Sequence, residues 1–224
     1  MTLRIFCLGI LALLSVDQAS AVSGQEAKPG SSPADRVEAT YRGGLVTPPL
    51  PKPRFVLTDT AGAPFDFWKR TQGSVTLLFF GFTYCPDQCP MHMANIAAAL
   101  KAIPAGIADQ VKLVFVTTDP ARDVPAVLRR WLDQFDNRFT GLTGTDAAIE
   151  AVQKSARVPP AQKTGFSKDD YAVAHANFVL AYTKDNLAHV IYPGGFGRDD
   201  WAHDLPLLVK ETWPHPKQIA RSSP

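Results

Sequence analysis

The sequence has few cysteines, no strong excess of charge and no basic run. Its 23 Lys and Arg residues nearly balance 21 Asp and Glu residues, which gives a formal net charge of +2. Nucleic-acid-binding domains and polybasic membrane anchors need clustered positive charge, so the composition argues against both. There is also no internal repeat, and 224 residues are enough for one sizeable core with terminal extensions. We therefore expect one folded domain and no nucleic-acid partner.

A hydrophobic run long enough to span a membrane as a helix is also missing. The apolar run at residues 5–16 follows Arg4 and has about 12 residues, short of the roughly 20 that a spanning helix needs. Ala19, Ser20 and Ala21 follow, in a small-residue pattern that signal peptidases recognise. We predict an exported protein, periplasmic or on the outer face of the inner membrane, with a signal peptide cleaved after Ala21. A retained anchor is the alternative.

The three cysteines divide into one that is expected to be lost and two that remain. Cys7 lies inside the predicted signal peptide and is removed with it. Cys85 and Cys89 then belong to an exported protein, where disulfide bonds persist. They can form a disulfide, bind a metal, or do both in turn. A purely structural disulfide is a weak explanation, because so short a loop loses little chain entropy and the core is large.

The composition along the chain predicts four parts. Residues 1–21 are the signal peptide, and residues 22–53 form an extended tether rich in Ser, Gly, Pro and Ala. Residues 54–213 form the folded domain, and residues 214–224 form a C-terminal tail.

Two apolar runs in the domain, at residues 75–80 and 111–117, predict buried central strands. The first is followed by a loop with both cysteines and by a helix at 91–102. The second is followed by a helix at 124–135, for which Asp123 is the predicted N-cap. This order predicts parallel strands joined by helices.

The second half of the domain predicts a helix capped by Thr145, a polar and mobile loop at 157–170, and an antiparallel hairpin of residues 172–183 and 187–192. A last helix is expected at 199–211. A parallel core that ends in a hairpin and a helix, with a cysteine pair where the first strand meets its helix, is typical of the thioredoxin-like fold. We therefore predict an α/β domain with a central mixed sheet flanked by helices.

Cys85 and Cys89 are separated by three residues and lie where a helix is predicted to begin. Thiols at positions i and i+4 lie on one side of a helical turn, so both sulfurs can bind one ion or bond to each other. A helix N-terminus stabilises the thiolate, which binds soft metals and attacks disulfides. Ordinary thioredoxin-type redox centres have two intervening residues, so this spacing leaves metal binding and redox chemistry both open.

Two sulfurs favour Cu(I) or zinc, and either ion needs at least one more donor. His175, in residues 171–178 (YAVAHANF), lies at or before a strand near the hairpin and could reach the cysteine loop. A hydrogen-bonded structural role is the alternative for this residue.

The other histidines have weaker cases. His92 lies between Met91 and Met93, but three consecutive side chains on a helix cannot all face one ion, so core or surface roles are expected. His189 is expected to face solvent from its strand. Two histidines have no ligand-like spacing, namely His203 and His215.

Several blocks of the sequence resemble a known family. Residues 81–90 (GFTYCPDQCP) resemble the signature of the Sco/SenC copper chaperones. Residues 118–123 (TDPARD) and 136–144 (DNRFTGLTG) resemble two further blocks of that family in the same order, and the segment around His175 resembles its late block. The resemblance covers about residues 54–211.

The resemblance implies that Cys85, Cys89 and His175 bind Cu(I) or Cu(II). It also implies a role in assembling the CuA centre of cytochrome c oxidase, as a copper donor, as a thiol reductant of the oxidase cysteines, or as both. The expected partners are the CuA-bearing subunit of the oxidase and other copper chaperones or thiol–disulfide reductants.

The sequence departs from the family pattern at two positions near these residues. Ala174 stands where an Asp often precedes the ligand histidine, and Gln88 stands where an aliphatic residue is frequent. A missing carboxylate would change the orientation or basicity of His175, because groups around a ligand tune metal affinity. The departures bear on the strength of copper binding.

Two enzyme functions remain as alternatives. An exported thiol–disulfide oxidoreductase would use Cys85 and Cys89 without a metal. A peroxidase related to peroxiredoxins would share the fold, but the Thr and Arg that activate its cysteine are not assignable in this sequence. His175 separates the first alternative from a copper site, because dithiol chemistry does not need an imidazole.

Overall fold

The computed structural model describes residues 41–165 and 171–213. The predicted signal peptide, residues 22–40 of the predicted tether and the predicted C-terminal tail lie outside these residues. In the part of the chain that is described, no helix is both long and apolar enough to cross a membrane.

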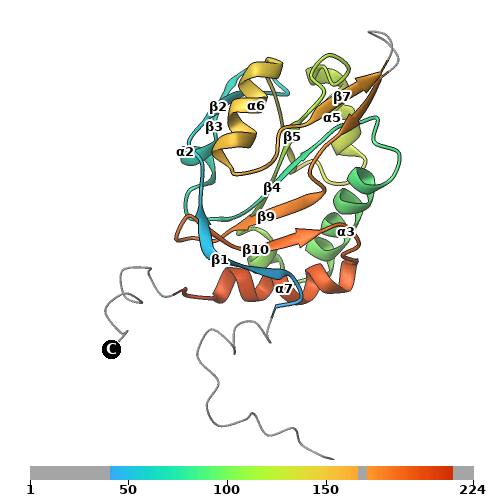
Figure 1. Cartoon of the computed structure of the whole chain (residues 1–224). Helices are drawn as coiled ribbons and strands as arrows, with labels where there is room; N and C mark the ends of the chain where they lie inside the picture. The colour runs from blue at the N-terminus through green and yellow to red at the C-terminus, as the bar shows by residue number, and fades with distance from the viewer. Residues whose placement is uncertain (1–40, 166–170, 214–224) are drawn as a thin grey trace, which may run out of the picture.

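The described residues form one large sheet, one small sheet and several helices (Figure 1). The strands are β1 (Gly44–Pro51), β2 (Val56–Asp59), β3 (Pro64–Asp66), β4 (Val75–Gly81), β5 (Val111–Thr117), β6 (Thr140–Thr143), β7 (Gln162–Gly165), β8 (Tyr171–Ala174), β9 (Phe178–Tyr182) and β10 (Leu187–Pro193). The helices are α2 (Phe67–Thr71), α3 (Gln88–Ala102), α4 (Ala105–Ala108), α5 (Pro125–Asp133), α6 (Asp146–Ser155) and α7 (Arg198–Lys210).

The large sheet has the strand order β1-β10-β9-β4-β5-β6-β2-β3. Strands β4, β5 and β6 are parallel, and the late hairpin β9–β10 joins them antiparallel to β4. The predicted thioredoxin-like α/β arrangement, with a mixed central sheet, flanking helices and a late hairpin, is confirmed.

Strand β4 is buried along its whole length because helices cover both faces of the sheet (Figure 1). Leu77 and Phe79 pack in a core cluster with α3, α5 and α7, whereas Leu78 and Phe80 pack in a second cluster with α6. A strand covered on both faces has a continuous apolar sequence, which is the pattern that predicted it. Each fully buried Leu or Phe side chain contributes about 1.5–3 kcal/mol, so the strand that leads to the cysteine loop is firmly held.

The predicted boundary of the tether at residue 53 is wrong. Gly44–Pro51 form β1, which pairs antiparallel with β10. β1 is an edge strand of the large sheet, and an edge strand accepts prolines because one of its sides has no partner that needs an N–H group. A proline-rich segment therefore belongs to the folded domain.

The predicted hairpin strand at 172–183 is two strands in different sheets. β8 pairs with β7 in the small sheet, and β9 pairs with β10 in the large one, so the chain changes sheets at residues 175–177. The loop predicted at 157–170 contains β7, whose four residues are all exposed. A fully exposed strand has no alternation of apolar and polar residues, so its sequence looks like that of a loop.

Candidate metal centre

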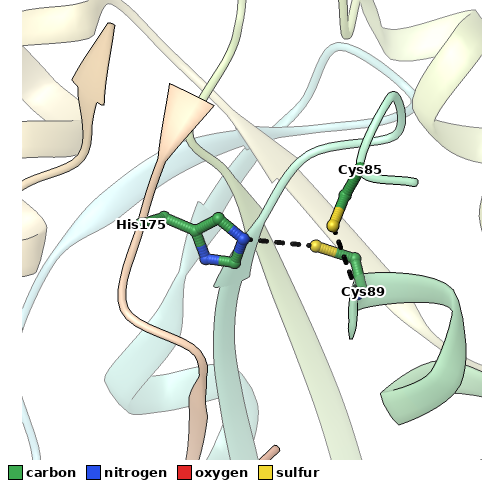
Figure 2. A group of neighbouring side chains, drawn as sticks. All are labelled: Cys85, Cys89 and His175. Atoms are coloured by element: carbon green, nitrogen blue, oxygen red, sulfur yellow. Dashed lines mark hydrogen bonds between the residues drawn. The ribbon is translucent and has the colours of Figure 1, made fainter. Parts of the chain in front are cut away.

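The cysteine loop leaves the end of β4 and runs directly into α3 (Figure 2). Cys85 is partly exposed in the loop, whereas Cys89 is the second residue of α3 and fully buried. The N-terminus of α3 has no side-chain cap, and the backbone N–H of Cys89 donates to Sγ of Cys85 over 3.4 Å. The unsatisfied N–H groups of a helix start therefore orient the Cys85 sulfur toward Cys89.

A buried carboxylate holds the start of the loop. Asp123 accepts hydrogen bonds from the backbone N–H and the hydroxyl of Thr83 at 3.0 and 2.5 Å, and from the hydroxyl of Thr117 at 2.6 Å. The prediction that Asp123 caps α5 is wrong, since Val124 is the N-cap residue and makes no side-chain cap. Burial raises the pKa of Asp123 above its usual value, although the hydrogen bonds from Thr117 and Thr83 oppose this shift.

The absence of a side chain at Gly81 makes room for the buried sulfur of Cys89. A Cβ atom at Gly81 would lie 2.9 Å from Sγ of Cys89 and 2.8 Å from the ring of Phe79. Any larger residue at position 81 would push the sulfur out of its place. The glycine is needed for this close approach and not for an unusual backbone conformation.

His175 lies in the short connection between β8 and β9, beside the cysteines (Figure 2). Its ring meets the rings of Phe79 and Phe82 edge to face, with centroids 5.9 and 5.6 Å apart. Nδ1 lies 3.0 Å from the carbonyl oxygen of Ala176, which can only accept, so Nδ1 carries the proton. The lone pair of the ring is then on Nε2, which lies 3.5 Å from Sγ of Cys89.

This carbonyl contact bears on the departure at position 174. A histidine that binds a metal usually donates its other N–H to a carboxylate, a carbonyl or water, which fixes the ring and its tautomer. The carbonyl of Ala176 fills this role here without an acidic residue at Ala174.

The possible ligand atoms of Cys85, Cys89 and His175 all lie within 4.8 Å of one another. Across the described ranges, no other group of three His, Cys, Asp or Glu residues converges in this way. Two thiolates and one neutral imidazole match the preference of Cu(I) for soft donors and low coordination number. Structural zinc usually has four protein ligands, so the donor set fits copper better.

The two cysteines share protons unequally. Hydrogen bonds from the Cys89 thiol and from the backbone N–H groups of Asp87 and Cys89 together lower the pKa of Cys85 to about 4, although burial opposes this shift. The same contact and burial raise the pKa of Cys89. At neutral pH the pair therefore holds one thiolate on Cys85 and one proton on Cys89, and a metal ion that binds both sulfurs must displace that proton.

The residues next to the pair on α3 do not join the three donors. Met91 is exposed, and Met93 is buried in the core. His92 is buried, and its Nε2 lies 3.1 Å from Oδ1 of Asn177. Burial lowers the pKa of His92, which keeps its ring neutral at pH 7. These positions agree with the core and surface roles expected for them.

The remaining histidines lie elsewhere. The prediction that His189 faces solvent is wrong, because it is buried, lies 2.7 Å from Asp185 and stacks on Trp213 with the ring centroids 4.0 Å apart. Trp213 follows α7 in sequence, and the strand pattern around His189 cannot show that this distant residue will cover the histidine. His203 is partly exposed and pairs with Asp204, and His215 lies outside the described residues.

Asn177 has no predicted role, yet it connects the two parts of the site. Its Nδ2 donates to Oε1 of Gln88 over 3.1 Å, and its Oδ1 faces His92. The sequence signal for Asn177 is a polar amide placed between a candidate ligand and an apolar strand.

The SCO1/SenC family profile matches residues 47–210 of the chain. Among curated proteins, the chain is 36% identical over 126 residues to a putative copper-binding protein of Stutzerimonas stutzeri, covering 55% of this chain and 60% of that protein. It is 35% identical over 140 residues to the protein sco1 of Schizosaccharomyces pombe, covering 62% of this chain and 52% of that one. The chain thus covers less than two thirds of the length of either relative.

Among solved structures, the chain is similar to Bradyrhizobium japonicum ScoI with copper bound. The TM-score is 0.61 at 32% sequence identity, and the match covers 71% of this chain and 99% of that one.

Proposed function

The chain belongs to the SCO1/SenC family, and from this premise we propose that it binds one copper ion through Cys85, Cys89 and His175. We further propose that it acts as a metallochaperone in the assembly of the CuA centre of cytochrome c oxidase. The observation that carries the proposal is the convergence of two sulfurs and one nitrogen within 4.8 Å. The similarity to copper-binding relatives supports it.

The proposed binding reaction needs the reduced cysteine pair. Copper takes the place of the proton on Cys89, and Nε2 of His175 supplies the third bond with its free lone pair. The buried Cys89 and the rings of Phe79 and Phe82 keep water from one side of the ion. A Cys85–Cys89 disulfide would consume both thiolates, so oxidation would prevent loading.

The proposed transfer begins at Cys85. Cys85 is partly exposed and Cys89 is not, so a thiolate of the CuA-bearing subunit can replace Cys85 first while Cys89 and His175 still hold the ion. Ligand exchange one bond at a time never leaves the copper free. Other copper chaperones could load the site by the reverse steps.

The same pair can serve as a thiol reductant. The Cys85 thiolate would attack a disulfide of the partner and release one thiolate, and Cys89 would then displace the second. The products are a Cys85–Cys89 disulfide and two reduced partner cysteines, so two electrons pass to the partner. Because the pKa of Cys85 is lowered to about 4, Cys85 is a thiolate at neutral pH and can make the first attack.

We also propose that the protein is exported and works in the periplasm or on the outer face of the inner membrane. The predicted signal peptide at residues 1–21 supports this location. The mature N-terminus would then be Val22, and mass spectrometry of the exported protein measures it directly.

A copper-independent thiol–disulfide oxidoreductase is the second candidate function, and the two free thiols with a depressed Cys85 pKa favour it. It does not account for a histidine that presents its unprotonated nitrogen to Cys89.

Titration of the reduced and the oxidised apoprotein with Cu(I), side by side, tests the proposal. We expect one copper per reduced chain and far weaker binding by the disulfide form. Equal copper retention by the two forms, or no binding by the reduced form, would contradict the copper site and favour the oxidoreductase.

A further inference from the structure

A polar bridge joins the segment that carries His175 to the helix that carries Cys89. The side-chain amide of Asn177 donates from Nδ2 to Oε1 of Gln88 over 3.1 Å. Its Oδ1 lies 3.1 Å from Nε2 of His92, which is the donor because an amide oxygen only accepts. Gln88 and His92 are one turn apart on α3, so Asn177 spans that turn.

The bridge acts where the backbone gives little support. β8 ends at Ala174 and β9 begins at Phe178, so no ladder of either sheet fixes His175. One backbone hydrogen bond holds the connection, from Gly194 N–H to the carbonyl of Asn177 over 3.1 Å. The position of the imidazole therefore depends on side-chain contacts.

The place of Gln88 makes the bridge specific to the site. Gln88 begins α3 and precedes Cys89, and Asn177 lies two residues after His175. A hydrogen bond between Gln88 and Asn177 thus joins the two backbone segments that carry Cys89 and His175, close to both residues in sequence.

Gly194 leaves the room that the bridge occupies. A Cβ atom at Gly194 would lie 2.3 Å from Nδ2 of Asn177 and 2.6 Å from Oε1 of Gln88. The two polar atoms that would clash are the two that form the hydrogen bond. A methyl group at position 194 would therefore separate them without removing either side chain.

We propose that Asn177 is a positioning residue that sets the distance of His175 from the two thiolates through its bridge to Gln88 and His92. The inference rests on the proposed copper site. Asn177 does not touch the ion; it acts by holding the third ligand in place before copper arrives. Preorganisation of this kind lowers the cost of ordering a ligand at the moment of binding.

A double-mutant cycle tests this role. Cu(I) affinity is measured by competition with a chelator for the wild type, Asn177→Ala, His175→Ala and the double variant, all reduced. Groups around a metal ligand typically change metal affinity by about 10- to 100-fold, and we expect Asn177→Ala to weaken binding within that range. In the His175→Ala background, Asn177→Ala should change affinity by less than about twofold, because there is no imidazole left to position.

Two further variants separate positioning from folding. Gly194→Ala should weaken Cu(I) binding as Asn177→Ala does, because it breaks the same hydrogen bond. It replaces Asn177→Ala in the test if that variant folds poorly. Asn95→Ala is the matched control, because Asn95 is also an asparagine with a hydrogen bond across the fold, from α3 to the carbonyl of Phe196 over 3.0 Å. Its Cu(I) affinity should stay within about twofold of the wild type.

A metal-free measurement adds a second test. The equilibrium of the Cys85–Cys89 pair with glutathione should be the same within about twofold in Asn177→Ala and wild type, because the bridge positions the histidine and not the thiols. A larger change would show that Asn177 shapes the cysteine loop and would overturn the positioning role.

The outcomes separate this inference from the function it rests on. If His175→Ala loses Cu(I) affinity as expected but Asn177→Ala and Gly194→Ala bind Cu(I) like the wild type, only the role of Asn177 is overturned. An equal loss from Asn177→Ala in both backgrounds would overturn it too, as a structural effect. Wild-type affinity in His175→Ala would instead overturn the proposed copper site.

Discussion

The two halves of the site are held in different ways. The cysteine half sits between a fully buried strand and the start of a helix, with Cys89 packed against Gly81. The histidine half lies between two strands of different sheets, where His175 is placed by aromatic contacts and by the bridge through Asn177.

This difference indicates which substitutions should abolish Cu(I) binding and which should only weaken it. The two sulfurs are brought together mainly by consecutive residues of one loop and helix, and Asp123 holds the start of that loop. The imidazole arrives through long-range contacts, each of which contributes a modest free energy. We therefore expect changes in the cysteine half to have large effects and changes around the histidine to have graded ones.

The largest contrast concerns the pH dependence of Cys85 in the metal-free protein. Its pKa is lowered to about 4, so the thiolate is present above that pH and is lost only as the pH falls through it. The rate of alkylation by iodoacetamide at Cys85 should stay constant within about twofold from pH 8 to pH 5, whereas an ordinary thiol would slow on the order of a thousandfold. Mass spectrometry of the labelled peptides measures the rate.

Cys89 provides the internal control for this experiment. Its raised pKa and burial should keep it unlabelled across the same range while Cys85 is modified. If the alkylation rate of Cys85 falls tenfold for each pH unit, the metal-free protein does not hold Cys85 as a thiolate, and this prediction is contradicted.

Replacing a sulfur of the cysteine half should have the next largest effect. Cys89→Ser keeps the size of the side chain but exchanges a soft thiolate for a hydroxyl, which is a poor Cu(I) ligand. We expect Cu(I) affinity to fall on the order of a hundredfold or more, which corresponds to about 2.7 kcal/mol. Chelator competition measures the affinity, and urea unfolding checks that the variant is folded.

Met91→Leu is the matched control on the same helix, because Met91 is exposed. It should bind copper like the wild type. Retained affinity in Cys89→Ser, or an equal loss in Met91→Leu, would contradict the assignment of Cys89.

Removing the histidine should cost less than removing a sulfur. His175→Ala leaves both thiolates, and we expect a loss of at least about tenfold in Cu(I) affinity, equal to about 1.4 kcal/mol or more, because even groups around a ligand have effects of this size. Disulfide formation and reduction should survive, because the thiolate of Cys85 is stabilised chiefly by Cys89 and by backbone N–H groups. Copper affinity and oxidase assembly in cells should decrease together.

The control for this variant is His203→Ala, since His203 is partly exposed and pairs with Asp204 on α7. If His175→Ala binds copper normally and supports the oxidase, the oxidoreductase function becomes the better explanation.

The smallest effect on Cu(I) affinity is expected at Tyr171, which holds the strand before His175. The hydroxyl of Tyr171, at the start of β8, donates to Oδ1 of the buried Asp119 over 2.5 Å, and Arg122 lies over its ring. Tyr171→Phe removes one hydrogen bond, worth about 0.5–1.5 kcal/mol, and should weaken Cu(I) binding by about two- to tenfold. Chelator competition again measures this change.

Tyr84→Phe is the control, because Tyr84 lies next to Cys85 but is 65% exposed. Its affinity should equal that of the wild type. A hundredfold loss in Tyr171→Phe would mean that the histidine half is as tightly coupled as the cysteine half, and the comparison would fail.

The same difference decides how much of the site could be predicted from the sequence. The strand that becomes β4, the cysteine loop and the helix after it follow one another in sequence, so apolar runs and helix signals predicted them together. The helix begins at Gln88, three residues before its predicted start, because the N–H of Met91 already donates to the carbonyl of Asp87 over 3.4 Å.

The histidine half depends on information that is not local. The exposed β7 has no apolar alternation, so the sequence could not show that residues 171–174 leave the hairpin to pair with it. Asn177 could not be interpreted without knowing that Gln88 and His92 face it. His175 was predicted as a ligand by its type and by resemblance, whereas its place beside Cys89 required the folded chain.

X-ray absorption spectroscopy of the Cu(I)-loaded protein tests the central claim most directly, because it counts the sulfur and nitrogen atoms bound to the ion. For the wild type we expect two sulfurs and one nitrogen, and for His175→Ala the two sulfurs without that nitrogen. A wild-type ion bound by sulfur alone, or a nitrogen that persists in His175→Ala, would contradict a copper site made of Cys85, Cys89 and His175.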